Sequence, residues 1–439
     1  MLALALCATG ALVGLKSYLD ERNDDSVEEL YDTNPIKQSK IESLLAEHTR
    51  ALTDRDEKTF VAPFDPTDKD LLANQTSRYR NLSKLPLADV RFVYRHKSAF
   101  RAVGGGHEVD VTVAFVHRFD GFDVGPVEEW YQWTIVQADQ GAPLKVIRAG
   151  GVPDERQRDA THYPAPWDKW RDIHVERTPH TLLIVDASLR AEAQRYAPTA
   201  EQAAVDDLAA WRAGGVSGKT PPGFVISLVN GRSEMGSLYR TTKETATESG
   251  VAIPVPPEGV LDGDENTPAV GATRVVINAR DEYYFTRGTR ERQLNLFRHE
   301  IGHALVGKLT ARAPGSSLVG ERENWVVEGF AEYLGHDRKP WLTSPRTPSS
   351  RAVIRQIGYP SSLPGTQSWE LEGRVEYHYW LGHSAIGYIV ERYGEQKMFQ
   401  LVVEHYRSGK LDDLTRDVLG VSYEEFEKEW AAYLKAKVR

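Results

Sequence analysis

An alternation of apolar and polar residues constrains the fold of this chain more than any other feature of its sequence. The apolar positions of the two clearest runs are Val90, Phe92 and Tyr94, followed by Val109, Val111, Val113 and Phe115. Two further runs, "EEWYQWTIV" and "PLKVIRA", come after them. Alternation with a period of two is typical of strands that bury one face. These runs predict a curved antiparallel meander.

A helix is predicted immediately before this meander, because Ile41, Leu44, Leu45 and Leu52 recur at the spacing of one helix face. A helix followed by a hydrophobic meander resembles the cone-shaped α+β fold of nuclear-transport-factor-like domains. The stretch "RALTDRDEKTFVAPFDP" is similar to the helix and turn that open such domains. The resemblance covers residues 38–150 and includes no catalytic motif. Such folds contain both enzymes and passive pockets, so the fold alone assigns no function.

Charge and cysteine content exclude several classes of function. The 439 residues include 54 Lys and Arg against 63 Asp and Glu, which gives a net charge of −9. The sequence has no basic stripe with interleaved aromatic residues, so we do not expect the chain to bind nucleic acid. The single cysteine, Cys7, leaves no disulfide framework and no thiolate metal site. Any metal ion must therefore be held by histidine and carboxylate side chains.

The N-terminal segment is apolar from Leu2 to Leu15 and is followed by Lys16 and the acidic run "DERNDD". It has the length of the apolar part of a signal segment and is shorter than the roughly 20 residues of a membrane span. We interpret residues 1–37 as a signal segment, or as the end of a membrane anchor that begins outside this chain, followed by an acidic linker. A buried helix is the alternative. The first interpretation predicts an extracytoplasmic protein, membrane-anchored through this segment or secreted.

The second half of the chain has a different pattern. Residues 151–173 are rich in Pro, Gly and charge, which predicts a linker with a domain boundary near residue 160. In residues 174–439, "HTLLIVDA", "PPGFVISLVN" and "GATRVVINA" read as strands, and the rest is mainly helical. A small sheet followed by helices is an α+β arrangement. A chain starting near Pro166 is therefore expected to fold by itself.

The stretch "RHEIGHALVG" contains the main chemical motif of the sequence. In a helix, His299 and His303 lie on one face, so both imidazoles can bind a zinc ion at about 2.0 to 2.1 Å. Glu300 is placed to face a water molecule rather than the metal. By chance the five-residue motif occurs in roughly one or two such chains per hundred, so a third ligand is required. Glu328 supplies one, 25 residues after His303 and at the start of a predicted second helix.

These two helices resemble the gluzincin zinc metallopeptidases of the peptidase MA clan. Trp325, Glu328, Gly329, Ala331 and Tyr333 match the W-x-x-E-G-x-A-x-Y context of the family's third ligand.

The resemblance implies that His299, His303 and Glu328 bind Zn²⁺ and that Glu300 is the general base. It also implies that Glu332 is the carboxylate that holds a ligand histidine, for which a surface glutamate is the alternative. The strand "ATRVVINA" is similar to the edge strand that binds peptide in this clan. The G-x-M-E-N motif of zinc aminopeptidases is absent, which disfavours an aminopeptidase.

A donor for the oxyanion is expected on a later helix, in "EYHYWLGHSAIGYIVERYG". By resemblance to peptidase-MA-like proteins, Tyr379 matches this role best. Tyr377, His378 and His383 remain alternatives, because the register of the motif is not fixed. A further alternative is that these residues belong to the core, where tyrosine is often buried with its hydroxyl bonded.

The sequence as a whole predicts a zinc metallopeptidase that acts on peptide or protein substrates, with a C-terminal gluzincin-like domain. The main alternative is a non-catalytic, zinc-containing binding or scaffold protein of the cell envelope. A globular protein without zinc is a second alternative, but it requires the context of Glu328 to be accidental.

Overall fold

The structure is a computed structural model that describes residues 34–152, 163–216, 220–239, 248–259, 270–310, 322–369, 374–408 and 411–438. The apolar segment predicted as a signal or anchor lies outside these residues. Within them, no helix combines the length and the apolar character that crossing a membrane requires. The predicted α+β class is confirmed, with two separate sheets and a helical C-terminal region.

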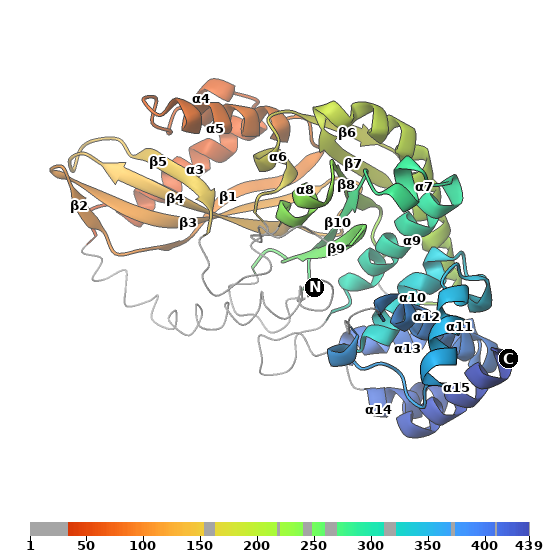
Figure 1. The fold of residues 1–439 in the computed structure, drawn as a ribbon. Helices are drawn as coiled ribbons and strands as arrows, with labels where there is room; N and C mark the ends of the chain where they lie inside the picture. The colour runs from red at the N-terminus through yellow and green to blue at the C-terminus, as the bar shows by residue number, and fades with distance from the viewer. Residues whose placement is uncertain are drawn as a thin grey trace.

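The N-terminal part is an antiparallel sheet with three helices packed against it (Figure 1). The strand order is β1-β3-β4-β5, and β2 pairs with β3. The strands are β1 Leu87–Lys97, β2 Arg101–Val103, β3 Gly106–Phe119, β4 Val127–Gln137 and β5 Lys145–Gly151. The helices are α3 Gln38–Thr53, α4 Glu57–Val61 and α5 Lys69–Leu82. Ile41 of α3 packs into one core with Val111 and Phe115 of β3, so the predicted helix and meander are confirmed.

The second sheet has the order β6-β7-β8-β10-β9. Its centre is parallel, because β8 pairs in parallel with both β7 and β10. The outer strands β6 and β9 run antiparallel to their neighbours. The strands are β6 Ile173–Arg177, β7 Thr181–Asp186, β8 Phe224–Val229, β9 Gly250–Val255 and β10 Ala272–Asn278. The three predicted strands correspond to β7, β8 and β10, whereas β6 and β9 were not predicted.

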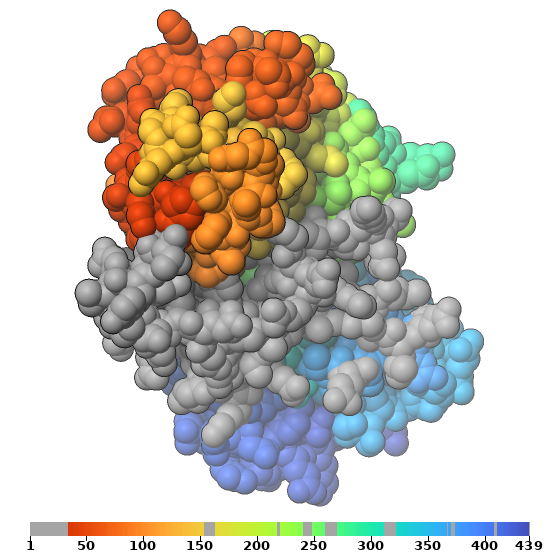
Figure 2. Space-filling view, turned by 90° about the vertical axis from the view of Figure 1, so that its left-hand side faces the viewer, coloured from red at the N-terminus to blue at the C-terminus, as the bar shows by residue number. Residues whose placement is uncertain are grey.

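Both faces of the second sheet are buried, but against different parts of the chain. Along β7, Leu182 and Ile184 belong to the core of the N-terminal part, and Leu183 and Val185 belong to the core of the helical part. Side chains of a strand alternate between its two faces, so the sheet separates the two cores. Figures 1 and 2 show the first sheet with helices α3 to α5 at one end of the described structure and the C-terminal helices at the other.

The predicted linker, residues 151–173, contributes to the first of these cores. Helix α6, Pro166–Lys169, carries Trp167, which is fully buried among residues of β3 and the second sheet. The indole also packs edge-on against Phe115 and Phe119. The part of the linker that the structure describes is therefore a packed connection between the two sheets.

Helices cover the other face of the second sheet. Helix α9, Arg290–Gly307, packs against α7, α10, β9 and β10. The remaining helices are α7 Arg190–Ala213, α8 Arg232–Ser237, α10 Asn324–Gly335, α11 Thr347–Ile357, α12 Val375–Tyr393, α13 Glu395–Ser408, α14 Leu411–Leu414 and α15 Tyr423–Lys437. Apart from α8, whose Met235 belongs to the core of the N-terminal part, these helices form one large core with the sheet. It includes Phe297, Ile301 and Leu305 of α9. This core fixes the rotation of α9 about its axis.

The prediction that "ATRVVINA" forms the edge strand is wrong. This segment forms β10, which lies between β8 and β9 inside the sheet. The edge strand next to it is β9, in which Pro254 occurs. Proline lacks a backbone N–H and is therefore confined mainly to edge strands and bulges. The proline-rich stretch around β9 hid its strand pattern, although the same proline is a signal of an edge position.

Candidate metal centre

Helix α9 presents two histidines to one point. The Thr289 side chain caps the helix by accepting a hydrogen bond from the backbone N–H of Arg292. The opposite face is anchored in the core by Phe297 and Ile301, both fully buried. His299 and His303, one turn apart, therefore point away from the core toward α10. The structure therefore places the two histidines on one face of the helix, as the sequence predicted.

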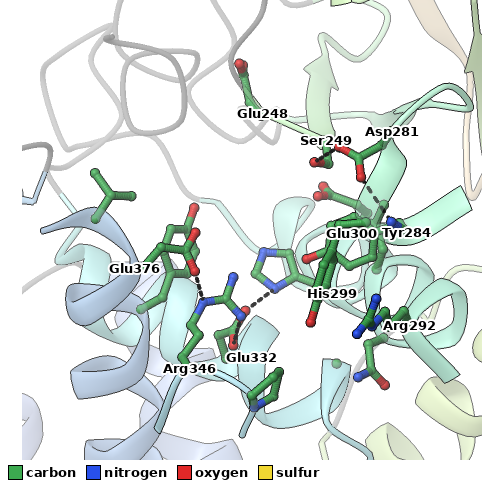
Figure 3. A pocket seen from close by; sticks show the side chains of 18 of the residues that line it. Glu248, Ser249, Asp281, Tyr284, Arg292, His299, Glu300, Glu332, Arg346 and Glu376 are labelled. Atoms are coloured by element: carbon green, nitrogen blue, oxygen red, sulfur yellow. Dashed lines mark hydrogen bonds and ion pairs between the residues drawn. The ribbon is translucent and has the colours of Figure 1, made fainter. Parts of the chain in front are cut away.

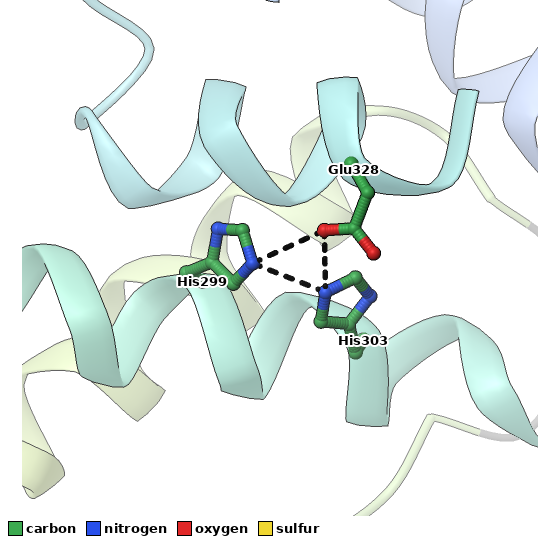
Figure 4. A group of neighbouring side chains, drawn as sticks. All are labelled: His299, His303 and Glu328. Carbon is green, nitrogen blue, oxygen red and sulfur yellow. Dashed lines mark hydrogen bonds and ion pairs between the residues drawn. The ribbon is translucent and has the colours of Figure 1, made fainter. Parts of the chain in front are cut away.

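Three candidate ligand atoms converge between α9 and α10 (Figure 4). The Nε2 atoms of His299 and His303 lie 3.2 Å apart. One oxygen of Glu328 lies 3.4 Å from the His299 Nε2 and 3.3 Å from the His303 Nε2. In a tetrahedron with bonds of 2.0 to 2.1 Å, neighbouring ligand atoms are about 3.3 Å apart. The spacing of the three atoms therefore matches that of ligands around a tetrahedral zinc ion.

Close helix packing places Glu328 and Tyr379 near the histidines. A Cβ on Gly329 would lie 2.5 Å from the backbone oxygen of Gly382 in α12, so only glycine allows this approach. The contact holds α12 against α10. Tyr379 lies one turn before Gly382 on α12, and its ring centroid is 6.0 Å from that of His299.

Glu332 holds the first ligand histidine in place. One carboxylate oxygen lies 3.2 Å from the His299 Nδ1, and the other accepts a hydrogen bond of 2.9 Å from Arg346. Glu332 is only 3% exposed, which removes the alternative of a surface glutamate. A carboxylate on Nδ1 fixes the ring so that Nε2 is free to bind metal. Arg346 also contacts Glu376, and it was not found from the sequence because it lies in a loop without a motif.

The charges of the centre are strongly coupled. Burial disfavours the charged form of His299, but the hydrogen bonds that it donates to Glu328 and Glu332 outweigh this effect and raise the pKa of His299 to about 10. Burial also disfavours the Glu328 carboxylate, but the charges and hydrogen bonds of His303 and His299 lower the pKa of Glu328 to about 2. A cation bound here would therefore compete with the proton on His299.

Glu300 faces a pocket of about 660 Å³ that is also lined by His299, Glu332 and Tyr379 (Figure 3). Burial raises the pKa of Glu300, and one of its oxygens has no hydrogen-bond partner in the part of the chain that the structure describes. A Cβ on Gly250, the first residue of β9, would lie 2.4 Å from the Glu300 carboxylate. Gly250 is therefore needed to leave room for this side chain, a role that the sequence did not indicate.

The structure separates Tyr379 from the other candidates for the oxyanion donor. Tyr379 lines the pocket, whereas Tyr377 stacks on Trp380 and His378 donates a hydrogen bond from Nδ1 to the Trp369 backbone oxygen at 2.7 Å. His383 is 1% exposed and faces His336 instead. Of these four residues, only Tyr379 is among the pocket-lining side chains.

A second group of possible ligands consists of Glu332, His336 and His383, all buried. One feature separates it from the first group. Arg346 already donates a hydrogen bond to Glu332, so a positive charge lies beside the only carboxylate of this second group. His299, His303 and Glu328 are therefore the stronger candidate for a metal site.

Comparison with protein-family models gave no match for this chain, and a search of curated proteins gave none either. The interpretation of the centre consequently depends on the motif in the sequence and on the geometry described above.

Proposed function

We propose that this chain is a zinc-dependent peptidase of the gluzincin type. One observation carries the proposal: three atoms spaced like the ligands of a tetrahedral zinc ion lie beside the buried Glu300 carboxylate, which lines a pocket. One oxygen of this carboxylate has no hydrogen-bond partner among the described residues. A site of three protein ligands that leaves one position open is typical of catalytic rather than structural zinc.

The residues of the site divide the work of peptide hydrolysis. Zinc, when bound, polarises the peptide carbonyl and makes a water molecule more acidic. The Glu300 carboxylate takes the proton from the attacking water and returns it to the leaving amine. The Tyr379 hydroxyl donates a hydrogen bond to the oxyanion that develops on the carbonyl. Glu332 keeps His299 oriented throughout.

Strand β9 is suited to hold an extended peptide. The backbone N–H of Asn278 in β10 bonds to the Ser249 oxygen, so in the antiparallel pair Val251 and Ile253 also bond inward to β10. Gly250 and Ala252 therefore direct their backbone groups to the outer edge, and Gly250 lies against Glu300. Pairing with this edge would bring a peptide bond to the carboxylate by backbone hydrogen bonds alone.

The alternative is a zinc-containing binding or scaffold protein without turnover. Glu300 favours the enzyme, because a site retained for structure alone does not require a buried carboxylate whose oxygen has no described partner. The proposed partners are peptide or protein substrates. The extracytoplasmic location, with the N-terminal segment as anchor or signal, remains a prediction from the sequence.

The experiment combines metal analysis with hydrolysis. Chain purified without chelator should contain about one zinc ion, and it should cleave members of a mixed peptide library in a reaction that a chelator stops and zinc restores. His303→Ala should lose both zinc and cleavage. His107→Ala, which changes a partly buried histidine of β3, is the matched control and should keep both. Absence of zinc even after its addition, or cleavage that persists in His303→Ala, would contradict the proposal.

A further inference from the structure

Arg292 lies on the same face of α9 as the zinc-binding histidines. It precedes His299 by seven residues, which is two helical turns, so both side chains project from one side of the helix. Both line the same pocket. In Figure 3, Arg292 lies on one side of His299, and Arg346 and Glu376 lie on the other. The pocket therefore has an arginine at each end.

The two arginines differ in their partners. Arg346 is neutralised by Glu332 and Glu376, with contacts of 2.9 and 2.7 Å. Arg292 has no carboxylate within ion-pair distance among the residues that the structure describes. Its guanidinium carbon instead lies 4.1 Å from the ring centroid of Tyr283, a residue of the π-helical turn η3, Glu282–Thr286. Arg292 is thus held against an aromatic ring, and no carboxylate among the described residues forms an ion pair with it.

This arrangement suits a particular class of ligand. A guanidinium that stacks on a ring by one face keeps the N–H groups on its edge free, and these match the two oxygens of a carboxylate. Arg232 of α8 lines the same pocket and also has no carboxylate partner within the described ranges. A peptide can supply a carboxylate either from an Asp or Glu side chain or from its C-terminus.

The position of Arg292 sets the distance of that carboxylate from the reacting bond. Seven residues of helix correspond to about 10 Å along the axis, at 1.5 Å per residue. An extended peptide advances about 3.3 Å per residue. A carboxylate bound at Arg292 would therefore belong to a residue about three positions from the scissile bond.

We propose that Arg292 forms a carboxylate-binding subsite, so that the enzyme selects peptides with an acidic group about three residues from the bond that it cleaves. This inference rests on the proposed peptidase function. Because Arg292 is half-buried and water screens it partly, the expected preference for an acidic over a matched neutral peptide is about tenfold in kcat/KM.

The test uses pairs of peptides that differ only by Glu against Gln at that position, and a second pair with a free or amidated C-terminus. Arg292→Gln should abolish the preference, and the pair that shows it identifies the source of the carboxylate. Arg290→Gln is the matched control, because Arg290 is exposed on the same helix and does not line the pocket. No preference in the unaltered chain, or a preference that survives in Arg292→Gln, would overturn the subsite.

Binding separates this inference from the proposed function. The binding of the same peptides is measured by fluorescence anisotropy on zinc-treated Glu300→Gln, which keeps Arg292. The subsite is supported if this variant binds acidic peptides more tightly and if adding Arg292→Gln removes the difference. If the unaltered chain then hydrolyses none of these peptides, the subsite stands and the peptidase is overturned. Hydrolysis without any acidic preference would overturn the subsite alone. If the peptides are neither bound nor hydrolysed, both proposals fail.

Discussion

The second sheet has buried charged groups on both of its sides, and the two sets are arranged differently. On the N-terminal side, Arg274 of β10 donates two hydrogen bonds to Asp123, at 2.6 and 2.9 Å, and Arg78 lies 3.2 Å from Asp168. On the helical side, the carboxylates and imidazoles of α9 and α10 converge on one point beside a pocket. The first set contains ion pairs between its own side chains and lies away from the pocket, whereas the second lies beside the pocket.

A shifted pKa does not distinguish the two sides. Burial raises the pKa of Glu129 on the N-terminal side, as it raises that of Glu300 on the helical side. Both carboxylates also have oxygens without a described hydrogen-bond partner. What differs is access: Glu300 lines the pocket, and Glu129 is 1% exposed and lies apart from it. A pKa shift caused by desolvation therefore shows only that a group is buried. A candidate site also requires convergent side chains and an open space beside them.

Removing the N-terminal part should have the largest effect of any change. The residues that would lose their cover on the second sheet are Leu182, Ile184, Val225, Val229, Val251, Ile253 and Val276. A chain starting at Pro166 is therefore expected to lose cooperative unfolding, although the boundary in the sequence favours independent folding. Thermal unfolding followed by circular dichroism measures this. A cooperative transition with zinc bound would show that the helical part is independent.

Breaking the ion pair between the two parts should cost less. Arg274 is 1% exposed, so Arg274→Met leaves Asp123 charged and buried, and the free energy of unfolding should fall by about 3 to 5 kcal/mol. Zinc content should remain the same, because the pair lies across the sheet from the centre. The double variant with Asp123→Asn removes both charges and should recover most of the loss in chemical denaturation. A double variant as unstable as the single one would contradict this account.

Changing Tyr379 to Phe tests the pocket side of the comparison. Loss of a single oxyanion donor should lower kcat by about 10² to 10³, with little change in zinc content or melting temperature. Tyr377→Phe is the control, because Tyr377 stacks on Trp380 outside the pocket and should keep its activity. If Tyr377→Phe lost activity and Tyr379→Phe did not, the donor would be assigned to the wrong residue.

The smallest effect concerns pH. Burial, followed by the charge of Arg274, lowers the pKa of His117 to about 3. The unfolded chain binds a proton at this residue below about pH 6.5, and the folded chain does not until about pH 3. The free energy of unfolding is therefore unaffected by the titration of this residue above pH 6.5. Below pH 6.5 it falls by up to about 1.4 kcal/mol per pH unit.

His117→Phe should remove this dependence on pH, because Phe does not titrate. The packing should be retained, because Phe can stack on Phe115 as His117 does, with ring centroids 4.6 Å apart. The measurement is the free energy of unfolding in urea at pH 7.5 and at pH 5.5, for the unaltered chain and the variant. An equal difference between the two pH values in both proteins would show that His117 does not titrate on unfolding.

Local patterns predicted the residues of the candidate metal centre, because they lie on two helices and match a sequence motif. His299 and His303 are one turn apart on α9, so helix geometry brings these two together. Glu328 lies within α10, and the packing of α10 on α9 brings it to the histidines. Arg346 and Gly250 could not be found in this way. They reach the centre from a loop and from the edge of a sheet, and only the packing of distant segments places them there.

The fold likewise combines elements with a local signal and contacts without one. Alternation predicted β1, β3, β4 and β5, because each run records its own buried face. The pairing of strands is a long-range property, and so the sequence placed β10 at the edge where the structure has β9. Sharing of one core between the N-terminal part and the second sheet likewise has no local signal.

Glu300→Gln tests the central claim most directly. The substitution keeps the size of the side chain and removes the proposed base, while the three candidate zinc ligands remain unchanged. Zinc content and melting temperature should stay as in the unaltered chain, and the rate of peptide hydrolysis should fall by about 10² to 10⁴. The measurement is kcat on a peptide that the unaltered chain cleaves, with zinc quantified in the same samples. Hydrolysis at an undiminished rate in zinc-containing Glu300→Gln would contradict the proposed mechanism.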